Sequence, residues 1–133
     1  MSEPVWVDKT TLLLLHAAAL AEHGGMEGLR DEGLLDSALA RPKNLFGYEG
    51  VESVARLAAA YAIGISRNHP FVDGNKRAAF IALALFVARN GSRLRAAQVD
   101  AARTMFAVAA GELGEKELAV WIEARMIERS EIE

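Results

Sequence analysis

An uninterrupted run of eleven apolar residues, AAFIALALFVA at positions 78–88, limits most strongly what this chain can fold into. The run has neither a polar stripe nor the alternation of a half-buried strand, so it predicts a helix that is buried on all sides. Such a helix is about 16 Å long, which is too short to cross a bilayer. We therefore expect it to form the centre of a folded domain.

A polar segment, HPFVDGNKR at positions 69–77, leads directly into this apolar run. It brings a histidine, a carboxylate, a glycine, an amide and two cations to the N-terminus of the predicted helix. The unpaired backbone N–H groups at a helix N-terminus already favour anions. The segment is therefore where we expect the chemistry of the protein.

The composition favours helices. Of the 133 residues, 52% are hydrophobic, and alanine and leucine dominate this fraction, with few β-branched runs. The length fits one domain over residues 1–133 with a single core. We expect an all-α protein, a compact bundle of about six helices around the central buried helix.

Charge and cysteine content exclude several classes of function. The net charge of −3 gives no global basic field for direct nucleic-acid binding, and the absence of cysteine excludes disulfides and thiol catalysis. The first residues, MSEP, lack the features of a secretory signal. We expect a cytoplasmic protein that does not enter a membrane.

The first half of the chain contains three predicted helices before the polar segment. Asp8 caps the first helix, which Gly24 and Gly25 end, and the glycine-rich stretch 24–30 is expected to be flexible. Asp31 caps a second helix that should end near Pro42, because proline lacks the N–H of the next turn. The stretch 43–50 then reads as a loop anchored by Phe46, and a third helix runs from about residue 51 to 68.

Two further helices follow Asn90 and Gly91, which end the central helix. One runs from about residue 98 to 110, and the other closes the domain before a charged tail that should fray from about residue 128. The inward positions expected on these two helices are Val99, Ala102, Phe106 and Ala109, and then Leu118, Trp121, Ile122 and Met126. His16 and His23 are expected to be solvated or to lie at the edge of the core.

Two residues of the polar segment can supply acid–base chemistry and bind a metal ion. Taken singly, a histidine at a helix end and an Asp–Gly pair are most often ordinary turn residues. In combination, His69 can take the proton of an attacking hydroxyl. Asp73 can hold a Mg²⁺ ion that bridges nucleotide phosphates, since Mg²⁺ in proteins is held by one or two carboxylates plus phosphate oxygens.

The other polar residues can hold phosphate groups. Gly74 permits a turn that directs successive N–H groups at a phosphate, and Asn75 can donate to a phosphate oxygen, although it could also simply cap the helix. Lys76 and Arg77 can neutralise the charge that shifts during transfer. Other nucleotide-binding signatures, including the P-loop and the kinase catalytic loop, are absent from the sequence.

The segment HPFVDGNKR resembles the signature loop of the Fic/Doc superfamily, and its ending GNKR is similar to that of the Doc (death-on-curing) toxin branch. In the Fic branch the loop continues GNGR and usually carries another arginine further on. Here Lys76 replaces that glycine and the second arginine is missing, which argues against adenylyl transfer.

The resemblance implies a toxin of a type II toxin–antitoxin pair. Such a toxin uses ATP and Mg²⁺ to phosphorylate a protein hydroxyl, on a translation elongation factor, and so inhibits translation. The resemblance implies His69 as the base, Asp73 as the metal ligand, and residues 74–77 as the phosphate site, with Arg67 also serving the nucleotide. The expected partner is a cognate antitoxin whose disordered segment folds into an apolar groove.

Two alternatives remain open at this point. A Fic-like adenylyltransferase would move AMP, not phosphate, onto a protein hydroxyl. A non-catalytic helical binding module would keep the loop only as a structural cap. Lys76 bears on the first alternative, because its side chain fills space that glycine leaves for a diphosphate, so the nucleotide would bind in another orientation with its γ-phosphate towards the acceptor.

Overall fold

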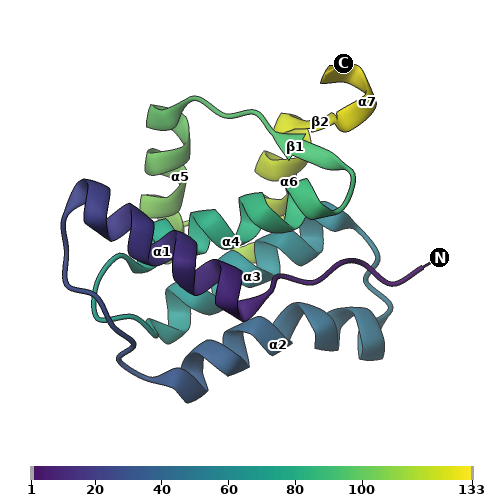
Figure 1. Ribbon diagram of the computed structural model, residues 1–133. Coiled ribbons are helices and arrows are strands. Elements are labelled where there is room, and N and C mark those ends of the chain that lie inside the picture. Colours follow the sequence, from purple (N-terminus) through teal and green to yellow (C-terminus); the bar gives the residue numbers. More distant parts are fainter. Residues whose placement is uncertain (1, 133) are drawn as a thin grey trace.

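Helix α3 (Val54–Asn68) lies at the centre of the computed structural model, which describes residues 2–132. It contacts α2 (Glu32–Glu49), α4 (Asn75–Arg89), α5 (Gln98–Ala109) and α6 (Glu115–Arg125), while α1 (Lys9–His23) packs on α4 (Figure 1). The prediction of an all-α bundle is confirmed, since these helices build the core.

The most enclosed helix is α3 and not α4. Every residue from 57 to 65 is buried, and small side chains let neighbouring helices approach closely. A Cβ added to Gly64 would lie 3.3 Å from Cα of Ala38 in α2. In α4, by contrast, a stripe containing Phe80, Ile81 and Leu85 is only half-buried, so the predicted burial on all sides is wrong for this helix. Its neighbours cover that stripe only in part.

Helix α2 does not end near Pro42, as the proline suggested, but continues through it to Glu49. Proline removes one helical hydrogen bond, yet its fixed φ is compatible with a helix. The residues beyond it pack on the core, and the ring of Phe46 meets Trp6 edge to face at 5.7 Å. Tertiary packing of the last turns therefore outweighs the local cost of Pro42, and Phe46 is an anchor as predicted.

Helix α5 has the predicted bounds, but the face that it turns towards the core is opposite to the predicted one. Its buried residues are Ala101, Thr104, Met105 and Val108. The side chains of Val99 and Phe106, expected inside, are 69% and 66% exposed. Alanines on both sides of this helix make its two faces similarly apolar, so periodicity alone could not choose between them.

A two-stranded antiparallel sheet, absent from the prediction, joins the end of α4 to the end of α6. Strand β1 (Ser92–Leu94) pairs with β2 (Met126–Glu128), and Arg93 lies opposite Ile127. Met126 therefore belongs to β2 and not to α6. A short helix, α7 (Arg129–Ile132), follows, and the N–H of Arg129 donates to the Gly91 carbonyl over 3.0 Å. Fraying of this tail stays a prediction.

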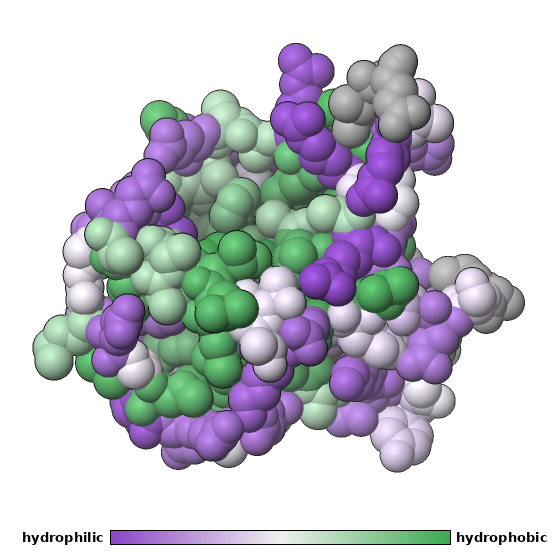
Figure 2. Space-filling model, viewed as in Figure 1, coloured by the Kyte–Doolittle hydropathy of each residue, from purple (hydrophilic) through white to green (hydrophobic). Residues whose placement is uncertain are grey.

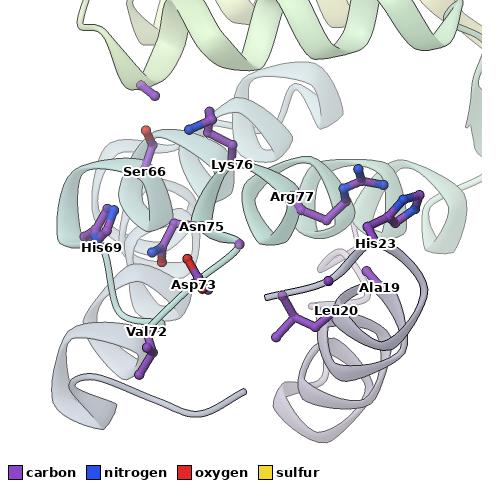
Figure 3. A pocket seen from close by; sticks show the side chains of 13 residues that line it. Ala19, Leu20, His23, Ser66, His69, Val72, Asp73, Asn75, Lys76 and Arg77 are labelled. Atoms are coloured by element: carbon purple, nitrogen blue, oxygen red, sulfur yellow. The ribbon is translucent and has the colours of Figure 1, made fainter. Parts of the chain in front are cut away.

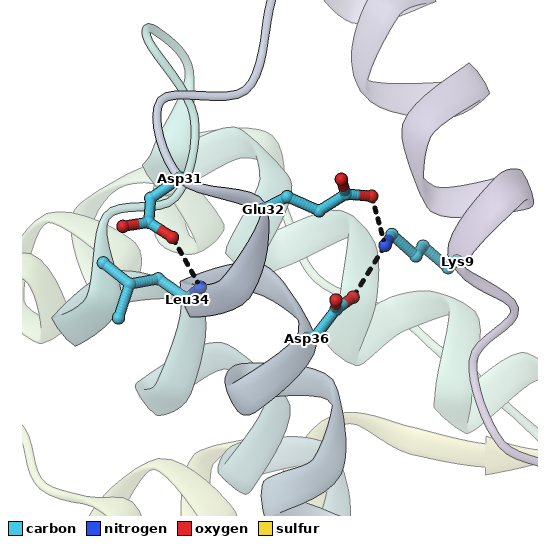
Figure 4. A network of polar contacts seen from close by, with 5 residues as sticks. All are labelled: Lys9, Asp31, Glu32, Leu34 and Asp36. Carbon is cyan, nitrogen blue, oxygen red and sulfur yellow. Dashed lines mark hydrogen bonds and ion pairs between the residues drawn. The ribbon is translucent and has the colours of Figure 1, made fainter.

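Side chains cap the first two helices and link them. Asp8 accepts from the N–H of Thr11 over 3.0 Å. Asp31 caps α2 in the same way by accepting from the N–H of Leu34 (Figure 4). Lys9 in α1 contacts Glu32 and Asp36 in α2, each over 2.7 Å. The hydrogen bonds that Lys9 donates to these carboxylates, the one to Asp36 first, raise the pKa of Lys9. Both predicted caps are thus confirmed.

Apolar side chains gather on the face where α1 lies across α4 (Figure 2), with hydrophilic residues around them. On α1, Leu14 and Leu15 are 67% and 41% exposed. Among the helices that the structure describes, none is long and apolar enough to cross a membrane.

Candidate active site

The polar segment forms a tight loop between α3 and α4 whose backbone is set by three residues. His69 caps α3 in the left-handed region with φ of 51°, Phe71 is buried in the core, and Gly74 starts α4 with φ of 74°. A left-handed conformation costs a non-glycine residue about 1–2 kcal/mol, so the contacts around His69 must hold it there.

Arg30 supplies two of these contacts. Its Nε donates to the carbonyl oxygen of His69 over 2.7 Å, and its Nη2 donates to that of Asn68 over 2.9 Å. The guanidinium thereby fixes the last turn of α3 and the exposed His69 together.

The stretch 24–30, expected to be flexible, lies along the loop and is bonded to it. The N–H of Met26 donates to Oδ2 of Asp73 over 3.0 Å, and the N–H of Val72 donates to the Gly28 carbonyl over 3.0 Å. A β-bridge joins Leu29 to Phe71. Glycines make this course possible, since φ of Gly25 and Gly28 is 125° and 124°. The stretch thus forms a wall beside the loop and is bonded to it.

A cavity of about 440 Å³ opens over the loop and the start of α4 (Figure 3). Six of the seven predicted site residues line it: His69, Asp73, Gly74, Asn75, Lys76 and Arg77. The cavity is also lined by Leu20 and His23 of α1 and by Ala109 of α5. The loop and helices from distant parts of the chain therefore build one site.

Arg67, the seventh predicted residue, lies elsewhere. It is exposed on α3 and lines a separate cavity of about 320 Å³ with Arg41 and Asn44 of α2. The helical period sends its side chain to a different face from that of Ser66, which lines the main cavity.

The start of α4 offers unbonded donors. The first helical hydrogen bond runs from Ala78 N–H to the Gly74 carbonyl, over 2.8 Å. In the described part of the chain, the N–H groups of residues 74–77 donate to no backbone or side-chain atom, and no side chain caps this helix. These amides form the positive end of a helix dipole beside the cavity.

The side chain of Asn75 has a structural role that was not predicted. Its Oδ1 accepts from the N–H of Phe71 and its Nδ2 donates to the carbonyl of Phe71, both over 2.9 Å, and the residue is 6% exposed. The side chain thus braces the loop, and both groups of its amide are already bonded to the backbone of Phe71.

The two cations flank the start of α4 on different sides. Lys76 extends towards α5, with Nζ 5.5 Å from the centre of the Phe106 ring, and Arg77 extends towards His23 (Figure 3). Within residues 2–130, neither side chain forms an ion pair with a carboxylate. Both charges therefore remain available to an anion in the cavity.

Asp73 is the one carboxylate among the described residues that line this cavity. No cluster of three histidine, aspartate or glutamate side chains exists in the described chain to hold a metal ion without a substrate. A single carboxylate fits Mg²⁺ that arrives with nucleotide phosphates, because the phosphates and water complete its shell. The N–H of Met26 occupies only Oδ2 of Asp73, which leaves Oδ1 for a cation.

A protein-family model described as the Fic/DOC family matches residues 6–87. This chain belongs to the Fic/DOC family. The match runs from before α1 to near the end of α4, so it contains the loop and every described residue that lines the cavity except Ala109. Membership in the Fic/DOC family confirms the resemblance seen in the loop.

Two curated relatives are similar to this chain over part of its length. The protein named "Protein kinase doc" of Escherichia phage P1 is 34% identical over 80 residues, 60% of this chain and 64% of the relative. The protein named "Toxin Doc" of Mycolicibacterium smegmatis is 42% identical over 84 residues, 62% of this chain and 64% of the relative. This Fic/DOC chain thus matches less than two thirds of the length of each relative.

Sequence reasoning missed Arg30 and His16 in this Fic/DOC site. His16, expected at the edge of the core or in solvent, is 3% exposed and contacts the loop. A signal for its position existed, because it lies four residues after Leu12 and four before Leu20, both of which are buried. Arg30 carries no comparable periodic signal.

Proposed function

We propose that this protein transfers the γ-phosphate of ATP to a hydroxyl of another protein. The observation that supports this most is the meeting of His69, Asp73, two unpaired cations and four free amides on one cavity. In-line phosphoryl transfer needs positioning and charge stabilisation more than covalent catalysis, and these residue types supply both. Arg67 is left out of the proposed phosphate site because it lines the other cavity.

In the proposed reaction, the acceptor hydroxyl loses its proton to His69 as its oxygen forms a bond to the γ-phosphorus. The bond from that phosphorus to the bridging oxygen of ADP breaks, and ADP leaves with the electron pair. The ring of His69 is exposed at the cavity rim and makes no hydrogen bond within the described chain, so a protein substrate can reach it. The N–H groups of residues 74–77, with Lys76 and Arg77, hold the phosphate charge.

Asp73 would hold Mg²⁺, which neutralises the β- and γ-phosphate oxygens when it is bound. Its carboxylate is fixed by the N–H of Met26, so the wall formed by residues 24–30 contributes to the metal site. We expect an affinity for ATP that depends on Mg²⁺ and that falls on Asp73→Ala. Asp36→Ala is the matched control, because Asp36 is an exposed carboxylate that pairs with Lys9 and does not line the cavity.

Transfer of AMP is the second outcome to be tested. A cell extract treated with this protein and ATP labelled at the γ-phosphate should gain label, and ATP labelled at the α-phosphate should give none. His69→Ala should abolish the transfer. Label from the α-phosphate alone would establish adenylyl transfer, and the absence of Mg²⁺-dependent ATP binding would establish a non-catalytic module.

We further propose that the protein is a toxin of a toxin–antitoxin pair, acting in the cytoplasm on a translation elongation factor. The names of the two relatives, a kinase and a toxin, and the resemblance of the loop support this. Expression in bacteria should stop growth, and His69→Ala should restore it. Mass spectrometry of the elongation factors from such cells should find a phosphate on one of them.

The proposed antitoxin segment would bind the apolar groove between α4 and α5. A cavity of about 530 Å³ lies there, lined by Phe80, Met105 and Phe106 and adjoining Lys76 and Arg77. A segment seated in it would cover both cations and so block the site. Phe106→Glu should weaken neutralisation, while Val120→Glu, at a 70% exposed position on α6, should not.

A further inference from the structure

His16 is a buried polar residue of α1 that contacts the catalytic loop from outside the sequence motif. Its Nε2 lies 2.9 Å from the carbonyl oxygen of Asp73, and its ring stacks on that of Phe71 with centroids 3.9 Å apart. A carbonyl oxygen can only accept a hydrogen bond, so Nε2 of His16 must carry a proton.

The hydrogen bond fixes the plane of the Asp73–Gly74 peptide. Because the described chain has no cis peptide, the N–H of Gly74 points in the direction opposite to the Asp73 carbonyl. The carbonyl faces His16, so this N–H points away from His16, and it donates to no other atom of the described chain. The contact thereby holds a donor free for an anion.

Packing reinforces this orientation. A Cβ at Gly74 would lie 3.0 Å from Nε2 of His16, so the imidazole is in close contact with the turn. Gly74 itself has φ of 74°, a region in which glycine rotates its peptide at little cost. Without a donor at position 16, the Asp73 carbonyl would lose its partner and the peptide could rotate. A carbonyl oxygen would then replace an N–H beside the phosphate site and repel the anion.

We propose that His16 is a positioning residue for phosphate binding, which acts by holding the Asp73–Gly74 peptide in the orientation that presents the Gly74 N–H. It touches neither nucleotide nor acceptor. The identity of the ligand as a phosphate rests on the proposed function. The orientation of the peptide rests on the geometry alone.

The test compares two substitutions at position 16 with a control in the same helix. His16→Gln retains an N–H donor near the position of Nε2, and His16→Leu fills the space without a donor. Leu12→Ala removes fully buried apolar volume from α1 away from the loop. Affinity for Mg·ATP, measured by calorimetry, should fall about 10- to 100-fold in His16→Leu, the usual cost of losing an outer-shell partner. His16→Gln and Leu12→Ala should bind close to the wild type, although Leu12→Ala melts at a lower temperature.

Equal affinity of His16→Leu and the wild type would overturn the proposal. Equal loss in His16→Gln and His16→Leu would also overturn it, since the stacked ring and not the donor would then be responsible.

A second measurement needs neither a variant nor nucleotide. Nitrogen NMR of the wild-type imidazole should find the proton of neutral His16 on Nε2, and a proton on Nδ1 would overturn the proposal. If the wild type binds no Mg·ATP, the proposed function fails. The position of the proton on the His16 ring would still test whether His16 orients this peptide.

Discussion

Asn75 and Phe71 are joined by a closed pair of hydrogen bonds, each of 2.9 Å, between the amide of Asn75 and both backbone groups of Phe71. This pair ties the start of α4 to the buried centre of the loop. The orientation of the candidate site residues on either side of it therefore depends on a side chain whose amide bonds to the loop backbone.

Asn75→Ala should lower the free energy of unfolding by about 1–3 kcal/mol, because two buried backbone groups lose their partners. Urea denaturation of both proteins measures the difference. Asn44→Ala, at an exposed position of α2, is the control and should stay within about 0.5 kcal/mol of the wild type. An Asn75→Ala protein as stable as the wild type would contradict the bracing role.

Gly74→Ala should destabilise the protein by more than about 1 kcal/mol, since the left-handed backbone conformation is unfavourable for alanine. The new Cβ would also lie 3.0 Å from His16 and 3.1 Å from Cδ2 of Leu20, so both must move. Gly47→Ala is the matched control in α2, where a Cβ meets no atom within 4 Å. It should raise stability by roughly 0.5–1 kcal/mol, and thermal melts of the two variants should shift in opposite directions.

Arg30→Ala should reduce the proposed phosphoryl transfer while the protein stays folded. Loss of its two bonds frees the backbone of Asn68 and His69, and misplacing a catalytic group by about 1 Å can cost about 100-fold in rate. Arg30→Lys should not restore the rate, because an ammonium cannot reproduce the planar fork. Arg93→Ala, on the exposed side of β1, is the control. Full activity of Arg30→Ala would show that His69 needs no such support.

Tyr61 should make stability fall at alkaline pH. Burial raises the pKa of its hydroxyl to about 12, against a model-peptide value near 10, while the same oxygen accepts from the N–H of Val7 over 3.0 Å. The unfolded chain releases this proton first as the pH rises through about 10, so unfolding becomes easier by about 1.4 kcal/mol per pH unit between 10 and 12.

Tyr61→Phe isolates this effect from other groups that titrate at high pH. At pH 8 the variant should be less stable than the wild type, because the N–H of Val7 loses its acceptor. The difference between the two free energies of unfolding should narrow by pH 11.5. A constant difference would place the pKa of Tyr61 near its ordinary value.

The sequence sufficed for the helices whose ends carry local signals and for the loop residues that are contiguous in the chain. Asp8 and Asp31 start their helices as expected, and six residues of the motif line one cavity. The Pro42 signal misled because packing of the following turns decides where α2 ends. The predicted buried face of α5 was wrong because alanines on both sides of this helix make its two faces similarly apolar.

Contacts between distant segments lay beyond sequence reasoning. The wall formed by residues 24–30 reads as a flexible glycine stretch, since its partners come about 40 residues later. Arg67 was assigned to the nucleotide site by resemblance alone. Its position on α3 instead places it at a second cavity. The sheet of β1 and β2 is too short to give a periodic pattern, and it brings together residues more than 30 positions apart.

The pairing of residues 24–30 with the loop has a consequence for protein engineering. A chimera that receives only the nine-residue motif on another helical scaffold would lack the N–H of Met26, the guanidinium of Arg30 and the imidazole of His16. A functional graft must therefore import two segments, one from α1 to Asp31 and one from Asn68 to the first turn of α4. The smallest transferable unit of this site is discontinuous in sequence.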